Sequence, residues 1–284
     1  MNKFKELTKF PYIWGEYKSN LSNLYLNMYK YGSIGVKKDG RNNIYKIESI
    51  IDKKFKNNIM KCYKSDSFEK ELLNKIHKQM NLIIKAYESK VNESNVIKFK
   101  FQVENRIIIG NSGGNYGNIS ILALHPTYCI PYIPSSAIKG AFRSYMIYTK
   151  YNGDESAAMK CEDFIKLFGS SDNGDEDEGK GIKGGVIFLD AFPEDEFVIE
   201  QDVQTVHYQK YYEGKSEPTD DLNKIPINMY AVGKTAFIIY AVFKKGVFNQ
   251  NQIKEFEEYF KETFTEFGIG AKTSIGYGLG KIIS

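Results

Sequence analysis

The sequence predicts an α+β fold with an antiparallel sheet, and three segments carry this prediction. Residues 66–87 repeat apolar side chains at helical spacing, and Asp66 with Glu69 has the pattern of a capping box at a helix start. Residues 97–103 alternate apolar and polar side chains, which is typical of a half-buried strand. Residues 250–267 place phenylalanines on one helical face.

The remaining segments supply the other elements of such a fold. We expect the strand that begins at residue 97 to continue to Ile109. Further strands are predicted at 119–124, 186–191, 197–203, 226–232 and 235–243, and further helices at 135–150 and 155–168. This order suits a ferredoxin-like (RRM-like) domain with the helices on one face of the sheet. In that fold the open face is a common platform for single-stranded RNA.

The chain divides near residue 95. Residues 1–95 carry mainly helical signal, and we expect them to form a small N-terminal region or an insertion. Residues 96–284 carry the strand and helix pattern of the main domain. A length of 284 residues suffices for one large domain or two small ones.

Composition points to an ordinary cytoplasmic protein. The hydrophobic fraction of 42% is that of a globular protein, the start lacks the apolar stretch of a signal peptide, and the longest apolar run, 236–243, is too short to cross a membrane. Cys62, Cys129 and Cys161 are far apart and odd in number, which favours neither a disulfide framework nor a zinc site. We therefore expect no metal, no cofactor and no membrane partner.

The net charge is +4, but the charged residues are distributed unevenly along the chain. Residues 1–110 hold 22 Lys and Arg against 11 Asp and Glu, whereas residues 111–284 hold 17 against 24. The acidic residues concentrate between Asp154 and Asp221. A basic half attracts polyanions and an acidic segment repels them, which restricts where a polyanion can lie. The alternative is that these lysines only keep helices solvated.

The glycine-rich stretch from Phe267 to Gly280 is the most informative segment. It combines five glycines with Lys272, two hydroxyl side chains and Tyr277. Exposed backbone N–H groups beside a lysine suit phosphate oxygens. A helix precedes this loop and a strand follows it, the reverse of an ATP-binding P-loop, and Ala271 stands where that loop needs glycine. The alternative is a hairpin that only turns the chain.

A second segment, Leu124 to Arg143, predicts another anion-binding element. Three prolines bias the approach away from helix, and Ser135 or Ser136 is a natural N-cap for the helix that follows. A helix N-terminus attracts anions, and Lys139 with Arg143 lies one turn apart on one face. Gly140 would admit a second backbone. The alternative is a capped helix with solvated charges.

These two segments resemble the paired signatures of RAMP proteins of type III CRISPR systems. The resembling residues are Ile133-Pro-Ser-Ser-Ala-Ile-Lys-Gly-Ala-Phe-Arg143 and Gly268-Ile-Gly-Ala-Lys-Thr-Ser-Ile-Gly-Tyr-Gly278. Among these proteins, the chain is most similar to the sixth subunit of the Cmr module in type III-B effectors. The resemblance covers roughly residues 96–284, although this family usually has Pro-Gly-Ser-Ser where this chain has Pro134 to Ala137.

The resemblance implies a crRNA-binding subunit that is not an enzyme and has no catalytic residue of its own. Such subunits cap the backbone filament near the crRNA 3′ end, so the expected partners are crRNA, other RAMP subunits and, as an open alternative, target RNA, with no direct DNA contact. The expected RNA-binding residues are Ser136, Lys139, Arg143, Gly270, Lys272, Thr273, Ser274, Gly276 and Tyr277. Tyr128 and Tyr132 are further stacking candidates, with core packing as the alternative.

Two other functions stay open. Other RAMP proteins are endoribonucleases that process crRNA, and such chemistry needs a general base, for which His125 and His207 are the candidates. Asp190, Asp202, Asp220 and Asp221 show no spacing that suggests a compact metal-binding pair. The acidic segment also suits an interaction protein that docks on a basic partner.

Overall fold

The computed structural model describes residues 32–39, 42–49, 62–89, 94–110, 119–120, 122–170, 181–206, 217 and 225–283. Its main sheet contains β4 (Asn95–Val103), β10 (Ala236–Phe243), β11 (Gly280–Ile283), β6 (Val186–Phe188) and β7 (Phe192–Pro193). The order is β11-β4-β10-β6, with β7 also paired to β10, and every pair is antiparallel. The predicted α+β class with an antiparallel sheet is confirmed.

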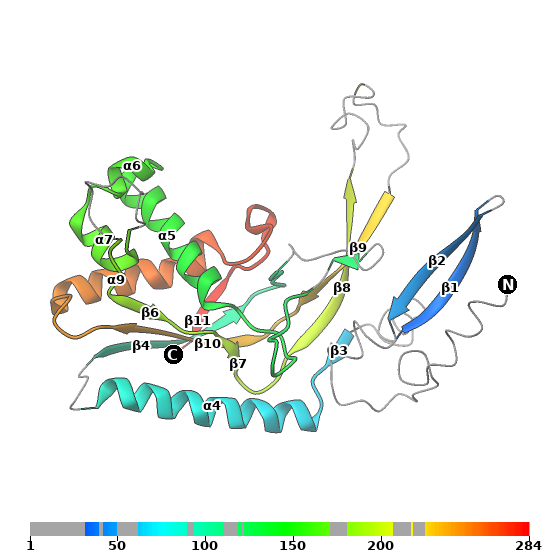
Figure 1. Ribbon diagram of the computed structural model, residues 1–284, viewed down its shortest axis with the longest axis horizontal. Helices are drawn as coiled ribbons and strands as arrows, with labels where there is room; N and C mark the ends of the chain where they lie inside the picture. The colour runs from blue at the N-terminus through cyan, green and yellow to red at the C-terminus, as the bar shows by residue number, and fades with distance from the viewer. Residues whose placement is uncertain are drawn as a thin grey trace.

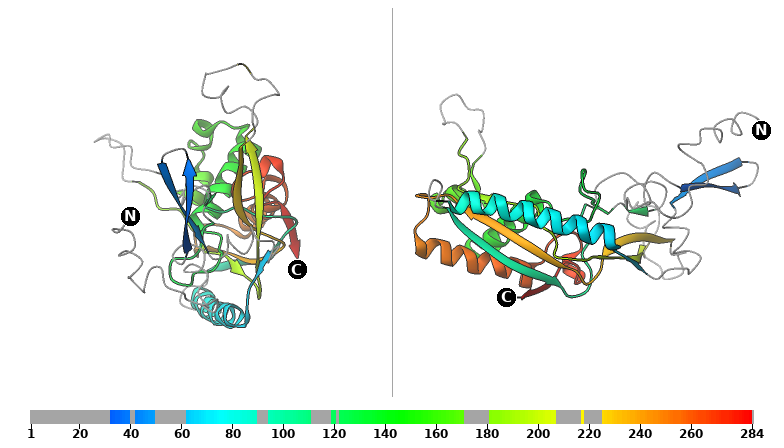
Figure 2. Two further views of the ribbon diagram at one scale, coloured as in Figure 1. Left: turned by 90° about the vertical axis from the view of Figure 1, so that its right-hand side faces the viewer. Right: turned by 90° about the horizontal axis from the view of Figure 1, so that it is seen from below.

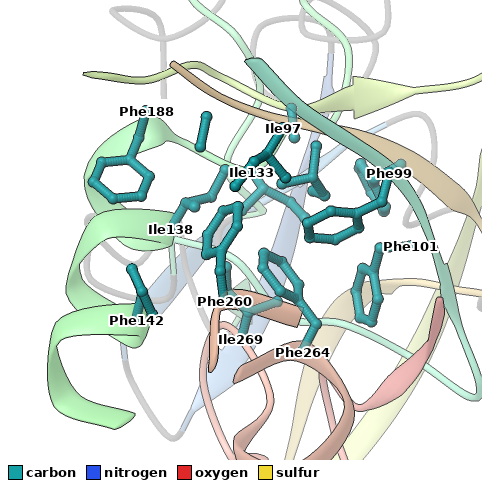
Figure 3. Packing of buried hydrophobic residues seen from close by; sticks show 14 of the residues in the cluster. Ile97, Phe99, Phe101, Ile133, Ile138, Phe142, Phe188, Phe260, Phe264 and Ile269 are labelled. Carbon is teal, nitrogen blue, oxygen red and sulfur yellow. The ribbon is translucent and has the colours of Figure 1, made fainter. Parts of the chain in front are cut away.

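One face of the main sheet carries the principal core. Helices α5 (Ser135–Tyr151), α6 (Glu155–Ala158), α7 (Glu162–Phe168) and α9 (Gln250–Glu262) lie on this face, and α9 continues into the π-helical turn η2 (Thr263–Phe267). Figure 3 shows how Phe99 and Phe101 of β4 meet Phe260 and Phe264, with ring centroids 5.0 to 5.4 Å apart. These apolar positions are the alternating residues from which the strand was predicted.

Helix α4 (Ser67–Glu88) lies on the opposite face of this sheet, as Figure 1 and the right panel of Figure 2 show. Ile84 of α4 packs with Tyr240 and Val242 of β10. The helices after residue 96 therefore share one face as expected, whereas α4, from the region before residue 95, covers the other face. The reason lies in β10, whose side chains are apolar on both faces, so that each face needs cover. The RNA platform expected on the open face is occupied by α4.

A second sheet adjoins the first. It contains β3 (Cys62–Lys64), β8 (Val198–Val206), β9 (Ile225–Val232) and β5 (Ile119–Ser120), in the order β3-β8-β9-β5, and only its β5–β9 pair is parallel. Figure 1 shows β8 and β9 extending together away from the helices. This sheet holds the strand predicted at 197–203, and it lies beside the C-terminal glycine loop.

The N-terminal part differs from its prediction. Strands β1 (Gly32–Asp39) and β2 (Asn42–Ser49) form an antiparallel hairpin, and β3 pairs with β8, so the described residues before 95 combine the predicted helix α4 with three strands that were not predicted. The Asp39-Gly40 dipeptide is a hairpin signal that the helical interpretation overlooked. The capping box of α4 is confirmed, since Asp66 and Glu69 each accept a hydrogen bond from the other's backbone N–H.

Several helix and strand boundaries also differ from the predicted ones. Strand β4 ends at Val103, and Ile107 forms only an isolated bridge to Val232. The helix predicted at 155–168 is split into α6 and α7. No helix among the described residues is long and apolar enough to cross a membrane.

Glu69 is a buried carboxyl at the first turn of α4, with 1% of its surface exposed. It accepts hydrogen bonds from the Tyr63 hydroxyl at 2.9 Å and from the Asp66 N–H at 3.0 Å. Burial raises the pKa of Glu69 to about 7, and these two hydrogen bonds only partly oppose the rise. The folded state therefore holds this proton more tightly than the unfolded state does.

This shift predicts a pH-dependent stability. The contribution of Glu69 is complete below its ordinary pKa of 4.5 and is lost as the pH rises through about 7. Glu69→Gln keeps a capping-box side chain but cannot ionise. Urea unfolding at pH 4.5 and pH 8 should show that the wild type loses about 1–3 kcal/mol more than the variant. Equal losses in the two proteins would contradict this assignment.

Candidate nucleic-acid interface

The C-terminal glycine loop runs from Gly268 to Leu279 between η2 and β11. Figure 1 shows it in red, rising from the sheet on the same side as α5. Lys272 and Gly276 both have left-handed backbone conformations and bracket a single 3-10 turn, η3 (Thr273–Ile275). Ser274 and Ile275 at the tip are exposed. The predicted glycine-rich loop therefore forms a structured turn with its tip in solvent.

Main-chain hydrogen bonds hold this loop against the segment that follows β4. The Ala271 N–H donates to the Ile108 carbonyl at 2.9 Å, and the Gly278 N–H donates to the Arg106 carbonyl at 2.8 Å. Gly278 has φ of 68°, and a Cβ built there would lie 1.9 Å from the Ile269 carbonyl oxygen. Glycine is needed here because the two ends of the loop close on each other.

A charge network joins the loop to β8. Arg106 donates to Glu200 at 2.5 Å and to Asp202 at 2.9 Å, and the Tyr277 hydroxyl donates to the same Asp202 carboxylate. Although burial works to raise the pKa of Asp202, the hydrogen bond from Tyr277 and the charge of Arg106 hold it below its ordinary value. Asp202 is thus a fixed anion that holds the Tyr277 ring in place.

Lys272 lies on the inner side of the loop. Its ammonium group is 3.6 Å from the Met229 sulfur on β9, and burial lowers the pKa of Lys272 while Asp202 opposes that shift. The cation is therefore partly desolvated, and an anion at this position would interact with it more strongly than in bulk water.

The start of α5 differs from its prediction. The N-cap is Pro134, not Ser135 or Ser136, and no side chain of the N-cap residue accepts a hydrogen bond. Instead the Asp190 carboxylate, from the segment after β6, accepts from the Ser135 N–H at 2.6 Å. A carboxylate of this chain therefore occupies part of the anion position expected at this helix terminus. Ser136 is exposed beside it.

Lys139 and Arg143 lie together farther along α5. Lys139 donates to the Phe168 carbonyl at 2.7 Å, and Arg143 pairs with Glu155 at 2.7 Å while lying 5.4 Å from the Phe164 ring centre. Both line a hollow of about 670 Å³, which we call the α5 hollow. A Cβ at Gly140 would meet nothing within 4 Å, so no backbone of the described chain approaches this glycine, contrary to expectation.

A second hollow, of about 600 Å³, opens beside the glycine loop, and we call it the loop hollow. Its lining includes Gly276 and Tyr277 from the loop, Arg106, and two lysines, Lys64 of β3 and Lys234 between β9 and β10. No lining residue is shared with the α5 hollow. The expected RNA-binding residues therefore fall into two separate groups. The sequence did not point to Lys64 and Lys234 as neighbours of the loop, because neither belongs to a sequence motif.

The histidine considered for catalysis and the tyrosines considered for base stacking are in contact with other residues of this chain. The His125 Nδ1 atom accepts from the Thr127 and Tyr128 N–H groups, each at 3.3 Å, and its ring lies 4.5 Å from that of Tyr128. Tyr128 and Tyr132 both pack against Phe192, which supports the core role for these two tyrosines. His207, Asp220 and Asp221 lie outside the described residues.

Comparisons with known proteins point to one superfamily. The family model described as the RAMP superfamily matches residues 100–281. A protein of Pyrococcus furiosus named CRISPR system Cmr subunit Cmr6 is 27% identical over 240 residues, which are 68% of this chain and 69% of that protein. A protein of Saccharolobus solfataricus named CRISPR system CMR subunit Cmr6 is 27% identical over 188 residues, which are 65% of this chain and 57% of that protein.

A solved structure with a similar fold is among the matches. It is a chain in the cryo-EM structure of the Type III-B Cmr-beta bound to cognate target RNA, with a TM-score of 0.55 and 20% identity. The match covers 100% of this chain and 86% of that one. At this identity the likeness concerns the fold.

The glycine positions give a graded stability prediction. Gly278→Ala should lower the free energy of unfolding by about 3 kcal/mol or more, because its Cβ would collide with backbone. Gly276→Ala should cost only about 1–2 kcal/mol, because its φ of 93° is strained but its surroundings are open. Gly140→Ala, inside α5, should stabilise by about 0.5–1 kcal/mol.

Chemical unfolding of the wild type and the three variants gives the free energies of unfolding that test this order. If Gly278→Ala proved as stable as Gly276→Ala, the loop would not be closed at Ile269 as described.

Proposed function

The chain belongs to the RAMP superfamily, and from this premise we propose that it is a non-catalytic crRNA-binding subunit of a type III-B CRISPR effector complex that targets RNA. The names of the two relatives support the kind of complex, since both are called Cmr6 subunits of CRISPR systems. The solved structure with the shared fold supports it as well, since that assembly is a Type III-B Cmr-beta bound to cognate target RNA.

The geometry of the glycine loop is the observation that carries RNA binding. The loop is held by main-chain hydrogen bonds from Ala271 and Gly278, so its exposed tip is already ordered before any ligand arrives. A preorganised loop loses less conformational entropy on binding. Backbone groups and a lysine at phosphates carry no sequence information, as a subunit that accepts many guide sequences requires.

Lys272 and the residues around it have defined roles in this proposal. Gly270, Thr273, Ser274 and Gly276 bring the backbone close to phosphate oxygens, and the partly desolvated Lys272 supplies the charge. Tyr277 is fixed by Asp202 and supplies an aromatic ring to the RNA path.

The α5 hollow is the second proposed RNA contact, through Ser136, Lys139 and Arg143. Each of the two cations is already bound to a neighbour of this chain, so RNA would displace or share the contacts with Phe168 and Glu155. The open space at Gly140 supports close approach by a ligand or neighbouring subunit at this helix face. We expect this element to contribute less affinity than the glycine loop.

The proposal includes no cleavage by this subunit. The lone pair of the His125 Nδ1 atom faces two backbone N–H groups, and its ring is packed among aromatic side chains. Both features suit a side chain that stabilises its own turn. His207 stays an untested candidate for the alternative, an endoribonuclease that processes crRNA.

RNA binding by the full chain is predicted to depend on salt through both elements. Lys272→Ala and Lys139→Ala should each flatten the slope of log K against log salt by about 0.7, and the double variant by about 1.4, because each removes one phosphate contact. The measurement is anisotropy of a labelled single-stranded RNA across a salt series, with a gel for products. We expect no cleavage.

Two controls make this test specific. Lys75→Ala removes an equally charged, exposed side chain from α4 and should leave the slope unchanged. Lys272→Arg keeps the charge and should retain most of the binding. Unchanged slopes in all variants would place the RNA path elsewhere, and cleavage products would favour the nuclease alternative.

The position in the complex gives a separate prediction. We propose that the subunit caps the backbone filament near the crRNA 3′ end, beside other RAMP subunits. In an effector assembled from its subunits, a photoreactive nucleotide near the 3′ end should crosslink to this chain, and the same nucleotide near the 5′ end should not. The reverse pattern would reject this placement but leave RNA binding intact.

A further inference from the structure

The loop hollow is lined by residues that could bind a ligand, and two of them, Lys64 and Lys234, lie outside both sequence motifs. We propose that it holds one nucleotide of the single-stranded RNA that follows the glycine loop, with Lys64 and Lys234 binding the phosphates on either side. This inference rests on the proposed function and adds two residues to it. Lys64 lies on β3, and Lys234 lies in the connection from β9 of the second sheet to β10 of the main sheet.

The two lysines are available to a ligand. Both side chains are exposed, and neither ammonium group has a hydrogen-bond or ion-pair partner among the described residues. Glu196 has an electrostatic interaction with Lys64, but its ion pair is with Lys70, at 2.9 Å. An anion that enters the hollow therefore meets two cations without first breaking an ion pair.

The acid within the hollow already has a cationic partner. Glu200 lines it, but its carboxylate is paired with Arg106 at 2.5 Å and is packed over Gly233, where an added Cβ would lie 2.9 Å from its oxygen. Arg106 carries one positive charge against the two carboxylates of Glu200 and Asp202, so together with Lys64 and Lys234 these groups carry a net charge of +1. This balance selects an anionic ligand.

The remaining lining suits a base. Ile275 lies at the rim with 69% of its surface exposed, and Tyr277 lies beside it with its hydroxyl bound to Asp202. A ring held in place in the free protein loses little entropy when a base packs against it. The exposed apolar side chain of Ile275 is available to pack against a base.

Size and continuity favour RNA as the occupant. A volume of about 600 Å³ lies within the range of roughly 300–1,000 Å³ that small-ligand sites occupy, enough for one nucleotide. Gly276 and Tyr277 belong both to the glycine loop and to the wall of the hollow. An RNA chain that follows the loop therefore reaches the hollow without crossing another part of the described chain.

Cys62 is a natural reporter because it lines the same hollow as a free, partly buried thiol. The experiment measures the rate at which N-ethylmaleimide modifies Cys62 in the full chain, with and without single-stranded RNA, by mass spectrometry. Cys129, which is not part of this lining, serves as the internal reference. RNA should slow the modification of Cys62 severalfold and leave Cys129 unchanged.

A variant pair tests the lysines directly. Lys64→Ala/Lys234→Ala should flatten the salt slope of RNA binding by about 1.4 and abolish the protection of Cys62. The matched control is Lys75→Ala/Lys254→Ala, which removes the same charge from exposed positions on α4 and α9 and should change neither quantity.

The outcomes separate the two proposals. If the wild type binds RNA but Cys62 is not protected and the slope of Lys64→Ala/Lys234→Ala is unchanged, the hollow is not part of the path and only this inference fails. If uridine monophosphate at equal phosphate concentration protects Cys62 as well as RNA does, the hollow is a free-nucleotide site, which also overturns it. If the wild type binds no RNA at all, the proposed function fails.

Discussion

Pairing of the last strand with β4 is the interaction on which the interface depends. Strand β11 lies so close to β4 that a Cβ at Gly280 would be 2.2 Å from the Gln102 carbonyl oxygen. This pairing fixes the end of the glycine loop, while η2, packed through Phe264 onto β4, fixes its start. Both ends of the glycine-rich loop are therefore anchored to the same strand, which restricts the conformations open to the loop. Its tip is then presented to solvent at little entropic cost on binding.

The charged residues extend this anchoring from one sheet to the other. Arg106 follows β4, Glu200 and Asp202 belong to β8, and Tyr277 belongs to the loop. Their network, one cation with two carboxylates and the Tyr277 hydroxyl, joins the loop to β8, and Lys64 and Lys234 line the hollow beside it. The acidic residues that the sequence concentrates after Asp154 are therefore partly used inside the protein. Asp190 at the start of α5 and Asp202 beneath the loop each hold a structural element in place.

Much of the fold followed from local patterns. The period of two in β4, the capping box of α4 and the apolar face of α9 act over a few residues, so the sequence alone located these elements. The apolar run of β10 predicted a strand, but not that both of its faces are buried or which helix covers the second face. That choice depends on how α4, distant along the chain, packs against Tyr240 and Val242.

The candidate site divides in the same way. The sequence by itself determined that a glycine loop with Lys272 follows the last helix and precedes a strand, because glycine content and helical period are properties of contiguous residues. Only the tertiary structure decided that Asp190 caps α5, that Lys139 and Arg143 line a hollow separate from the loop, and that Lys64 and Lys234 lie beside Tyr277. These relations join residues dozens of positions apart, and they depend on sheet pairing and side-chain packing, which no local pattern encodes.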